Sequence, residues 1–538
     1  MKKIFYLLFA LAATTLQAQT VNGPAARKLQ MAEFAITNLY VDEVDENKLV
    51  EAAIIEMLEK LDPHSTYSDA EEVKKMNEPL QGNFEGIGVQ FQMVEDTLFI
   101  VQPVSNGPSE KVGILAGDRI IAVNDTTIAG VKMSQEEIMS RLRGPKGTKV
   151  ELTIVRRGVS EPLRFTVKRD NIPIFSLDAS YLIEPRIGYI RINRFGATTA
   201  EEFSTAMKAL QKKGMKDLII DLQGNGGGYL NAAIDIVNEF LQQKELIVYT
   251  EGRASKRSDF LAKGDGKFKD GRLIVLVDEY SASASEIVAG AIQDWDRGAI
   301  VGRRSFGKGL VQRPIDLPDG SMIRLTIARY YTPSGRSIQK PYESSALATD
   351  SLRNEENNSL RYRRELLERY NRGELIHADS IHFADSLITY TLKSGRVVYG
   401  GGGIMPDVFV PIDTTLYTNY HRNLVAKGVI LKVTTQYIDH NRNQLLATYR
   451  KFETFDEKFE VDESLLARMR ELAGEEGIEF NEEQYQTSLP LIKTQLKALI
   501  ARDLWDITEY FQVINTTNQS VLRALEIIRS PEYEELLK

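Results

Sequence analysis

The sequence predicts a layered α/β body that carries a small β-rich module and has helical regions at both ends. Between residues 187 and 327, strand-like apolar runs alternate with segments of helical periodicity, which is typical of a layered α/β core. Residues 84–169 instead show short apolar runs of period two, broken by Gly and Pro, as in a compact β domain. Residues 413–538 are mostly charged and helical in pattern. The fold class is therefore α/β with added helical and β-rich regions (α+β).

Length and composition are those of a soluble multidomain protein. At about 150 residues per domain, the 538 residues allow three or four domains. Hydrophobic residues make up 43% and charged residues 26%, so neither a disordered chain nor a membrane-embedded body is indicated. The 67 basic and 75 acidic residues give a net charge of −8, which does not suggest a nucleic-acid surface, since such a surface needs clustered Lys and Arg. We therefore expect no nucleic-acid partner.

The first residues have the pattern of a signal peptide. Two lysines precede a short apolar run at residues 4–13 and a polar stretch that ends at Ala18. The run is shorter than the roughly 20 apolar residues that a spanning helix needs, and no later run reaches that length. The chain has no cysteine, which excludes a lipid-anchored cysteine, a disulfide and a thiol nucleophile. We expect export, to the periplasm, without an integral membrane span.

The rest of the chain is divided by changes in its periodicity. Helical spacing of apolar residues at 24–61, interrupted by an acidic segment, predicts two helices there. The core should contain strands at 218–222, 273–277, 299–302 and 322–327, and helices at 200–212, 229–241 and 284–294. The expected regions are a signal peptide (1–18), an N-terminal helical region (19–81), the β-rich module (82–170), the α/β core (171–342 and 394–412), a charged insertion (343–393) and a helical extension (413–538).

A candidate nucleophile follows one of the expected core strands. Residues 278–286 read Asp-Glu-Tyr-Ser-Ala-Ser-Ala-Ser-Glu and lead into a helical segment. Ser283 has small neighbours, and the positive helix terminus favours negative charge that develops near its oxygen. Serine is also a favoured helix N-cap, so Ser281, Ser283 and Ser285 could equally be caps or turn formers. This segment alone favours the capping role.

The base that activates the serine decides which class of hydrolase is expected. None of the histidines lies in a recognisable triad context, and all fall outside the segments that carry the candidate nucleophile: His64, His377, His382, His421 and His440. Lys308, between two glycines beside an apolar strand, is the alternative. An unperturbed lysine pKa of about 10.4 must fall by roughly three units, at a cost of about 4 kcal/mol, which burial can supply. Gln312 could orient the amine without adding charge.

A glycine-rich turn offers the third element of a hydrolytic site. Residues 218–229 run from an apolar strand through Gly224, Gly226, Gly227 and Gly228 into a helical segment. Backbone N–H groups at such a turn can bind an oxyanion or a phosphate. The spacing matches neither a dinucleotide fingerprint nor a P-loop, because no Lys-Ser/Thr follows. We therefore favour an oxyanion hole.

Together these residues resemble the C-terminal processing peptidases, or tail-specific proteases, of the S41 type. The resemblance extends from about residue 61 to residue 410, and the separation of 25 residues between Ser283 and Lys308 also fits that family. The matching motifs are Leu-Asp-Pro-His-Ser-Thr-Tyr at 61–67, the glycine turn, Ser-Ala-Ser-Ala-Ser-Glu at 281–286, Phe-Gly-Lys-Gly at 306–309 with Gln312, and Gly-Gly-Ile-Met-Pro-Asp at 402–407.

The resemblance implies a role for each site residue. Ser283 would be the nucleophile, Lys308 the general base and Gln312 the residue that positions the lysine. The oxyanion hole would come from the backbone of Ala284 and of one glycine of the pair Gly227 and Gly228. The family implies a crotonase-like core and chemistry without a metal or other cofactor. The chain departs from the usual turn, because Gln223 replaces an Arg and Gly226 a frequent Pro, which puts any contact made by that Arg in doubt.

The β-rich module resembles a PDZ domain. Its carboxylate-binding loop would include Gly86, Ile87, Gly88 and Val89, whose N–H groups could bind a terminal carboxylate while the next strand pairs with the peptide. The implied partners are polypeptide substrates with free C-termini. A module that serves only as a spacer is the alternative, and homo-oligomer formation is left open.

The function that we expect is therefore cleavage of exported proteins or peptides by a serine endopeptidase with a Ser-Lys dyad. One alternative is a catalytically silent protein that binds C-terminal tails as a scaffold. Another is a crotonase-like acyl-CoA enzyme, since this fold can host such chemistry. The export signal and the PDZ-like module disfavour the second alternative.

Overall fold

The computed structural model describes residues 23–341 and 356–538, which form two compact units. The smaller unit contains residues 23–73 and 312–326, and the larger contains residues 74–311, 327–341 and 356–538. The expected signal peptide at 1–18 lies outside the described residues, as does the start of the charged insertion at 343. The domain boundaries given above remain predictions.

The larger unit is built on a six-stranded sheet of order β10-β11-β12-β15-β16-β21. β10 runs antiparallel to β11, and the following strands are parallel to their neighbours. Parallel strands buried on both faces need continuous apolar runs, and β15 is buried at all five positions. The strands are β10 (Leu177–Glu184), β11 (Ile187–Ile192), β12 (Asp217–Asp221), β15 (Leu273–Val277), β16 (Ala299–Gly302) and β21 (Val408–Phe409).

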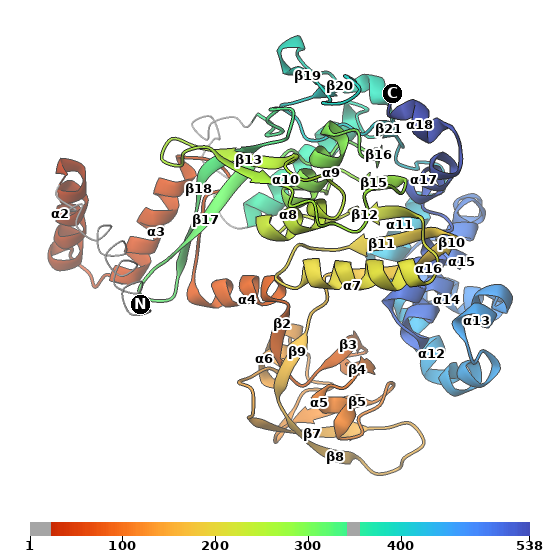
Figure 1. Ribbon diagram of the computed structural model, residues 1–538. Helices are drawn as coiled ribbons and strands as arrows, with labels where there is room; N and C mark the ends of the chain where they lie inside the picture. Colours follow the sequence, from red (N-terminus) through yellow and green to blue (C-terminus); the bar gives the residue numbers. More distant parts are fainter. Residues whose placement is uncertain (1–22, 342–355) are drawn as a thin grey trace, which may run out of the picture. The chain divides into compact units, whose positions relative to one another are not determined.

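Helices cover both faces of this sheet (Figure 1). On one face α7 (Thr199–Lys212), α8 (Leu230–Asn238) and α9 (Ala284–Asp294) share a core with strand residues such as Ile220 and Val275. On the other face α17 (Gln519–Arg529) packs against alternating strand residues such as Ile219 and Ile274. The expected layered α/β core is therefore confirmed, with helices at or within two or three residues of the predicted bounds. The strand expected in the core at 322–327 is instead part of β18 (Met322–Tyr331), which belongs to a separate sheet because it pairs with β1 and β13 rather than with the core strands.

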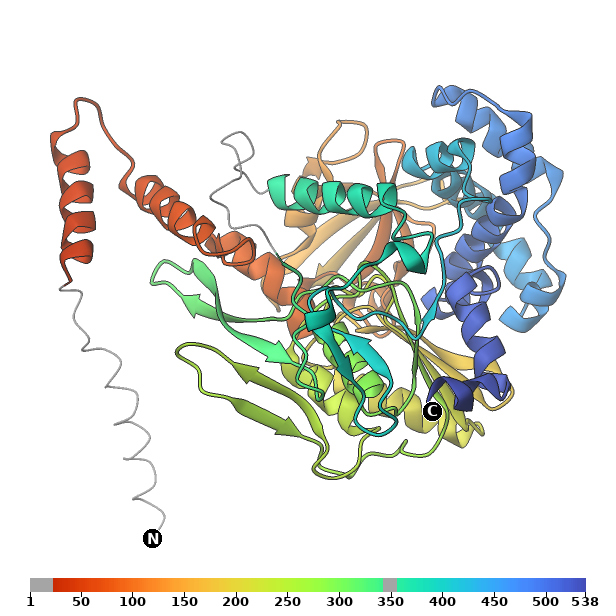
Figure 2. The same ribbon diagram turned by 90° about the horizontal axis from the view of Figure 1, so that it is seen from above.

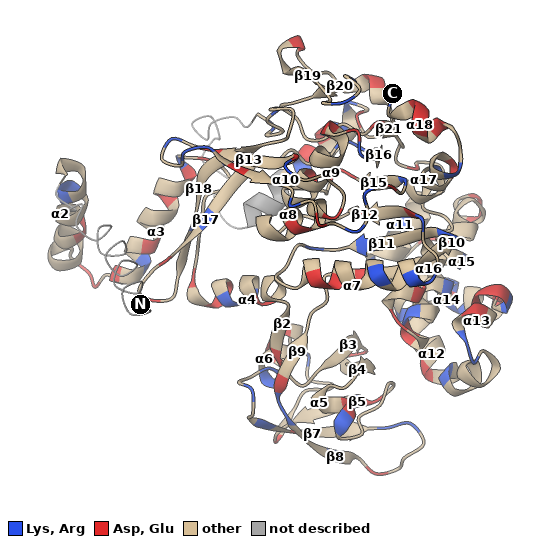
Figure 3. Ribbon diagram, viewed as in Figure 1, with Lys and Arg blue, Asp and Glu red and all other residues tan. Residues whose placement is uncertain are grey.

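α7 illustrates why these segments are helical. Phe203, Met207 and Leu210 recur at helical spacing and are fully buried against the sheet. Its first turn is acidic and its last turn basic, as the red and blue segments of Figure 3 show, and both charges stabilise the helix dipole. Packing and helix electrostatics therefore favour the same structure.

The β-rich module has a sheet of order β3-β4-β5-β7-β8, with β6 paired to β5, and a separate β2-β9 pair. Its core is formed by apolar residues of these strands together with Ile138 and Leu142 of α6. The elements are β2 (Asn83–Gly86), β3 (Val89–Val94), β4 (Thr97–Pro103), α5 (Pro108–Lys111), β5 (Arg119–Val123), β6 (Thr126–Thr127), α6 (Gln135–Leu142), β7 (Lys149–Val155), β8 (Leu163–Lys168) and β9 (Asp170–Pro173).

The C-terminal extension is helical and has its own hydrophobic core, and its helices lie together in blue in Figure 2. α12 also contacts the β-rich module, because Asp439 accepts from Arg119 at 2.8 Å and Thr435 donates to Gln92 at 2.7 Å. The helices are α11 (Asn419–Ala426), α12 (Val429–Thr448), α13 (Phe452–Lys458), α14 (Glu463–Glu475), α15 (Glu482–Leu504), α16 (Ile507–Ile514), α17 and α18 (Glu532–Leu536).

The smaller unit contains the two predicted N-terminal helices, α2 (Pro24–Leu39) and α3 (Glu46–Glu59), which confirms that expectation. β1 (Thr66–Ser68) pairs antiparallel with the first part of β18 (Met322–Tyr331), and β17 (Leu310–Asp316) also pairs with β18. α4 (Ala70–Gln81) begins in this unit and continues into the larger one.

Three further parts belong to the larger unit. β13 (Leu246–Glu251) pairs with β14 (Ser258–Leu261) and with the end of β18. The charged insertion contains α10 (Glu356–Asn371), two 3-10 turns at Ala378–Ser380 and Asp385–Leu387, and β19 (Ile388–Tyr390), which pairs antiparallel with β20 (Val397–Tyr399) just beyond the insertion. Among the residues described, none of the helices is long and apolar enough to cross a bilayer.

Candidate active site

Ser283 lies at the sharp turn between β15 and α9. Its backbone has φ 55° and ψ −111°, a conformation that non-glycine residues adopt at a cost of about 1–3 kcal/mol and that surrounding contacts must hold. The two neighbouring serines are fully buried and bound to the glycine turn, Ser281 Oγ to Leu222 O at 2.8 Å and Ser285 Oγ to Asn225 O at 2.9 Å. Of the three candidate serines, Ser283 alone is partly exposed.

The side chain of Glu286 ties the nucleophile to the lysine loop. This fully buried carboxylate accepts from Ser283 N at 2.8 Å, Ser305 Oγ at 2.5 Å, Gly307 N at 2.7 Å and Lys308 N at 2.9 Å. Burial raises the pKa of Glu286 above its usual range, while the hydrogen bonds from Ser305, Lys308, Gly307 and Ser283 favour the charged form and lower it. One carboxylate therefore fixes the backbone of both candidate dyad residues, Ser283 and Lys308.

Tyr330, near the end of β18, contacts the backbone carbonyl groups of the same two residues, Ser283 and Lys308. Its hydroxyl is within hydrogen-bonding distance of the carbonyl oxygens of Ser283, at 3.1 Å, and of Lys308. Its own N–H donates to Gly309 O at 3.0 Å. The ring is buried, and burial raises the pKa of the phenol well above its usual range. The hydroxyl therefore stays a donor between the two carbonyls.

Lys308 lies in an irregular segment two residues before β17. The glycines on either side allow close packing of this segment. A Cβ on Gly307 would stand 3.1 Å from Gly403 N, and one on Gly309 would stand 3.0 Å from Gln339 N. Gly307 also has φ +90°, in the region that favours glycine. The two glycines therefore fix how the lysine loop sits on neighbouring backbone.

The glycine turn and the nucleophile turn interlock through Asn225. Its carbonyl accepts from Ala282 N at 3.0 Å as well as from Ser285 Oγ, and its side chain donates to Ile192 O at 2.8 Å. The side-chain oxygen of Asn225 accepts from Gly227 N at 2.8 Å. Asn225 is fully buried, so it connects β11, the glycine turn and the segment that carries Ser283.

Gly227 and Gly228 approach the backbone of Ser283 and of Phe195 more closely than other residues could. A Cβ on Gly227 would stand 2.8 Å from Ser283 Cβ and 3.0 Å from Ala284 N, and one on Gly228 would stand 2.1 Å from Phe195 O. Phe195 N donates to Gly227 O at 2.9 Å. Within residues 23–341 and 356–538, the N–H groups of Gly228 and Ala284 donate to no protein acceptor, whereas the Gly227 N–H is bound to Asn225.

Gln223, where the family usually has Arg, is bound by the C-terminal extension. Its side-chain oxygen accepts from Asn518 Nδ2 at 3.0 Å, and its amide nitrogen donates to Ser520 Oγ at 3.3 Å. Arg191 donates to the carbonyl of Gln223 at 2.7 Å and to the carboxylate of Asp221 at 2.5 Å. The turn is therefore held by an arginine of β11 and by the start of α17.

Gln312, the third predicted catalytic residue, belongs to the smaller unit. Its side-chain nitrogen donates to the carbonyl of His64. The motif around His64 is itself ordered, because Asp62 Oδ1 accepts from the N–H groups of His64 and Ser65 at 2.8 Å each, and Thr326 N donates to Ser65 Oγ at 3.1 Å. The structure thus brings Ser283 and Lys308 together within the larger unit and places Gln312 in the smaller one.

The predicted peptide-binding loop joins two strands of the β-rich module. Gly86 ends β2, Val89 begins β3, and Gly88 between them has φ +71°. The carbonyl of Ile87 accepts from Ser109 Oγ at 2.6 Å, and that of Gly88 accepts from Val104 N at 2.9 Å. In trans peptides the N–H points opposite to the preceding carbonyl, so the N–H groups of Gly88 and Val89 point away from these partners.

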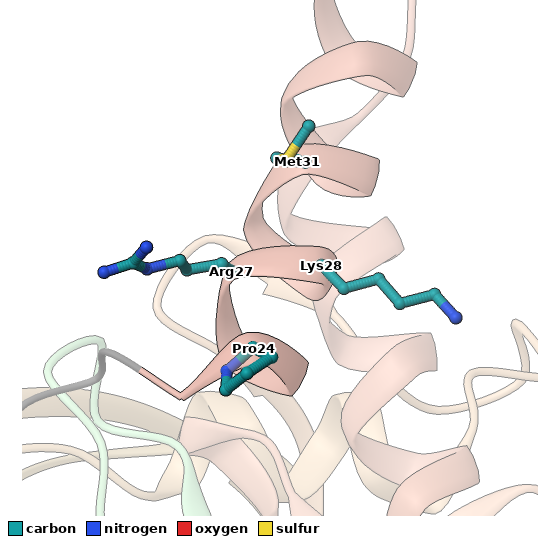
Figure 4. A pocket seen from close by; sticks show the side chains of 4 residues that line it. All are labelled: Pro24, Arg27, Lys28 and Met31. Atoms are coloured by element: carbon teal, nitrogen blue, oxygen red, sulfur yellow. The ribbon is translucent and has the colours of Figure 1, made fainter.

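Two other features do not form a second site. Figure 4 shows a hollow lined by Pro24, Arg27, Lys28 and Met31, but all four are exposed side chains of the single helix α2.

The described residues contain no group of three or more His, Asp or Glu side chains placed to hold a metal ion. In the larger unit, His421 and His440 lie in the C-terminal extension and bind Gln495 Oε1 and Gln436 O.

Sequence reasoning missed the roles of Glu286 and Tyr330. Glu286 had a local signal, because Ser-x-x-Glu is the spacing of a capping box, in which the Glu side chain reaches back to the N–H of the helix-capping residue. Nothing local marks Tyr330, which reaches Ser283 from 47 residues away in the chain.

Comparison with known proteins gives matches to four family models. Residues 186–344 match peptidase family S41, residues 86–168 a PDZ domain, residues 11–72 the N-terminal domain of the activating protease CtpB, and residues 420–506 a family of unknown function. The first two matches cover the segments that carry the candidate dyad and the predicted peptide-binding loop.

Curated relatives match over most of their own length. The carboxy-terminal-processing protease of Bartonella bacilliformis is 40% identical over 355 residues, which are 63% of this chain and 80% of that protein. The carboxy-terminal processing protease CtpB of Bacillus subtilis is 37% identical over 329 residues, 61% of this chain and 68% of that protein. A solved photosystem II D1 C-terminal processing protease is 28% identical, and the match covers 58% of this chain and 89% of that one at a TM-score of 0.33.

Proposed function

The chain belongs to peptidase family S41 and is a serine-type peptidase with a PDZ domain, and we propose that it cleaves polypeptides with Ser283 and Lys308 as a Ser-Lys dyad. The main support for the proposal is that the same two side chains bind the backbone of both residues. Glu286 binds both backbone N–H groups, and the Tyr330 hydroxyl lies between both carbonyl oxygens. Such a fixed geometry is what a nucleophile and its base require.

In the proposed mechanism, neutral Lys308 removes the proton of Ser283 Oγ as this oxygen attacks the scissile carbonyl carbon. The tetrahedral intermediate collapses to an acyl-enzyme, and the Lys308 ammonium gives its proton to the leaving amine. Lys308 then removes a proton from water, which attacks the ester carbonyl, and returns that proton to Ser283 Oγ. Peptide bond cleavage by water is balanced, and no further reagent is needed.

The oxyanion hole is assigned to the N–H groups of Ala284 and Gly228. The N–H of Gly227 is already bound by Asn225, which supports Gly228 as the donating glycine of the pair. Ala284 is the first residue of α9, so its N–H has no partner within the helix, and the positive end of the helix dipole favours the oxyanion there. These donors act on negative charge that develops only during the reaction.

Gln312 is assigned as the residue that positions Lys308, on the strength of the family resemblance and of its place four residues further along the chain. A neutral amide suits this role. Unlike a carboxylate, it can accept a hydrogen bond from the amine without the negative charge that would raise the lysine pKa and keep the base protonated.

The PDZ domain is proposed to bind the free C-terminal tails of substrates. β3 is an edge strand of its sheet, so its open side can pair with an extended peptide. The N–H groups of Gly88 and Val89 point away from the acceptors within the domain, so they can bind the terminal carboxylate. Gly88 has φ +71°, a left-handed conformation that glycine adopts without strain.

Location and assembly complete the proposal. The pattern of residues 1–18 supports export, to the periplasm in a cell with two membranes. Homo-oligomer formation is consistent with α2, where Met31, Phe34 and Leu39 are 72%, 64% and 77% exposed.

A tail-binding scaffold without activity, and an acyl-CoA enzyme, are the alternatives. Relatives that are named proteases at 37–40% identity disfavour the second.

The proposal is tested by incubating the purified protein with a disordered polypeptide and mapping the cut sites by mass spectrometry. Cleavage by the wild type, and none by Ser283→Ala, supports it. Intact substrate with both proteins would favour the scaffold, whereas CoA-dependent turnover of an acyl-CoA would favour the crotonase-like acyl-CoA enzyme.

A further inference from the structure

α10, in the charged insertion, contacts the turn that carries the nucleophile. The Tyr362 hydroxyl donates to the carbonyl of Glu279 at 3.1 Å, and its ring meets that of Tyr280 edge to face at a centroid distance of 5.7 Å. Tyr280 precedes Ser283 by three residues. Glu279 is itself buried and paired with Arg303 at 2.6 Å, so the contact reaches a rigid part of the turn.

The same helix contacts the lysine loop. The Tyr362 ring lies 5.2 Å from that of Phe306, measured between centroids, and Phe306 precedes Lys308 by two residues. One turn later, Glu365 binds Lys340 with both carboxylate oxygens at 2.6 Å. Lys340 Nζ in turn stands 3.6 Å from the centroid of Phe306, and Lys340 N donates to Gly307 O at 3.0 Å.

A third turn of α10 extends the contact along this loop. Arg369, with a side chain that is 3% exposed, donates to Arg304 O at 2.8 Å. Tyr362 therefore contacts residues just before both Ser283 and Lys308, and Arg369 contacts a residue just before Lys308. Glu365, on the same face of the helix, reaches the lysine loop through Lys340. Aromatic pairs and a half-buried ion pair are among the contacts whose geometry is well defined, and helix spacing places all three in register.

We propose that α10 is a brace that fixes the nucleophile turn relative to the lysine loop, with Tyr362 as its central positioning residue and Glu365 as the second. The inference rests on the proposed dyad and deepens it, because it assigns a role to the charged insertion. Tyr362 touches both segments, whereas Glu286 and Tyr330 hold the dyad residues from within the core. Losing the brace should let the base drift from the nucleophile without disturbing the substrate-binding groups.

The test compares kcat and KM for cleavage with the rate at which a serine-reactive phosphonate labels the protein. A displacement of about 1 Å in reacting groups can cost up to about 100-fold in rate. Tyr362→Ala should therefore lower kcat and the labelling rate by about 10- to 100-fold, with KM within about twofold of the wild type. Tyr362→Phe keeps the ring and loses one hydrogen bond, so it should restore both rates to within about fivefold. Tyr370→Ala, at an exposed position of the same helix, should change neither.

Glu365→Gln provides a second variant that keeps the shape of the side chain. It should lower kcat about 3- to 10-fold, because the half-buried Lys340 loses its charged partner. The matched control is Glu368→Gln, whose pair with Arg372 at 4.0 Å is exposed and is worth little. If Tyr362→Ala proves unfolded at the assay temperature, Glu365→Gln decides.

Three outcomes would count against the brace, and only the last of them also counts against the dyad on which it rests. Wild-type rates in folded Tyr362→Ala and Glu365→Gln would overturn the brace alone, since the dyad would still be labelled. A drop in kcat of Tyr362→Ala that Tyr362→Phe does not restore would also overturn it. A wild-type protein that the phosphonate does not label at Ser283 would instead overturn the proposed dyad, and the brace with it.

Discussion

The peptidase core and the PDZ domain prepare their functional groups in opposite ways. In the core, buried side chains hold the dyad residues by their backbones. Glu286 receives four donors and Asn225 binds three segments. In the PDZ domain, the carbonyls of Ile87 and Gly88 are bound inside, while N–H groups of the loop and the free edge of β3 face outward.

Because of this difference, amino-acid substitutions should affect the two sites in different ways. A site held by side chains is sensitive to isosteric changes at buried polar positions, because each leaves several donors without an acceptor. A site made of backbone groups tolerates side-chain changes and is sensitive to whatever alters the path of the loop or fills its space. The core should therefore control kcat, and the PDZ domain should control how efficiently a tailed substrate is captured.

The largest effect is expected from the dyad itself. Ser283→Ala and Lys308→Ala should each lower kcat/KM by about 10⁴-fold or more while the fold remains intact. Lys308→Arg should fail equally, because a guanidinium does not deprotonate in proteins. The measurement is cleavage of a disordered substrate, with circular dichroism to check folding. Robust activity in any of the three variants contradicts the assignment.

The next largest effect is expected from Glu286→Gln. It should lower kcat about 100-fold and the free energy of unfolding by about 2–3 kcal/mol. The amide cannot accept all four hydrogen bonds that the carboxylate receives. Kinetics on the folded fraction and denaturant unfolding measure the two effects.

Glu202→Gln is the matched control for this change. Glu202 also accepts backbone N–H groups, from Ser176 at 2.8 Å and Leu177 at 3.2 Å, but on α7, away from the dyad. It should lose stability and keep kcat. An unchanged kcat in Glu286→Gln would show that the shared hold is not needed for catalysis.

The pH dependence should show one limb from the lysine. Lys308 must be neutral to act, and it is protonated at low pH, so the rate should rise about tenfold per pH unit up to an apparent pKa well below 10.4, and then level off. His64→Ala should keep this limb, because the proposed base is Lys308 rather than a histidine. Its disappearance in that variant would point to a histidine instead.

The smallest effect is expected from the PDZ loop. Amidating a substrate's C-terminus, or changing Gly88 to Val, should lower kcat/KM about 3- to 10-fold, because the tail no longer raises the local concentration of the cleavable segment. Labelling of Ser283 by a small phosphonate should stay at the wild-type rate. Equal cleavage of free and amidated tails would remove the tail-recognition proposal and leave the peptidase.

Much of the core could be predicted because its signals are local. β15 and α9 have the bounds that periodicity gave, and Ser283 lies between them. The glycine turn and the helices of the N-terminal region were recognisable for the same reason. Residues at these positions are constrained by neighbours only a few positions away in the chain, so their pattern is sufficient.

The contacts that hold the dyad could not be predicted, because they join distant parts of the chain. Tyr330 and Tyr362 look like ordinary strand and helix residues, and only the fold brings them to Ser283 and Phe306. The sequence puts in doubt any side-chain contact at Gln223, where the family usually has Arg. In the structure, Asn518 of the C-terminal extension donates a hydrogen bond to this side chain. The charged insertion and the C-terminal helices thus have contacts at the site that periodicity alone cannot assign.

The proposed Ser-Lys dyad is tested most directly by labelling with a serine-reactive phosphonate, followed by peptide mapping. We predict one covalent adduct per chain, on Ser283, formed by the wild type and lost in Ser283→Ala. Lys308→Ala should react far more slowly although it keeps the serine, because its nucleophile lacks a base. An adduct on another residue, or undiminished labelling of Ser283 without Lys308, would contradict the Ser-Lys dyad.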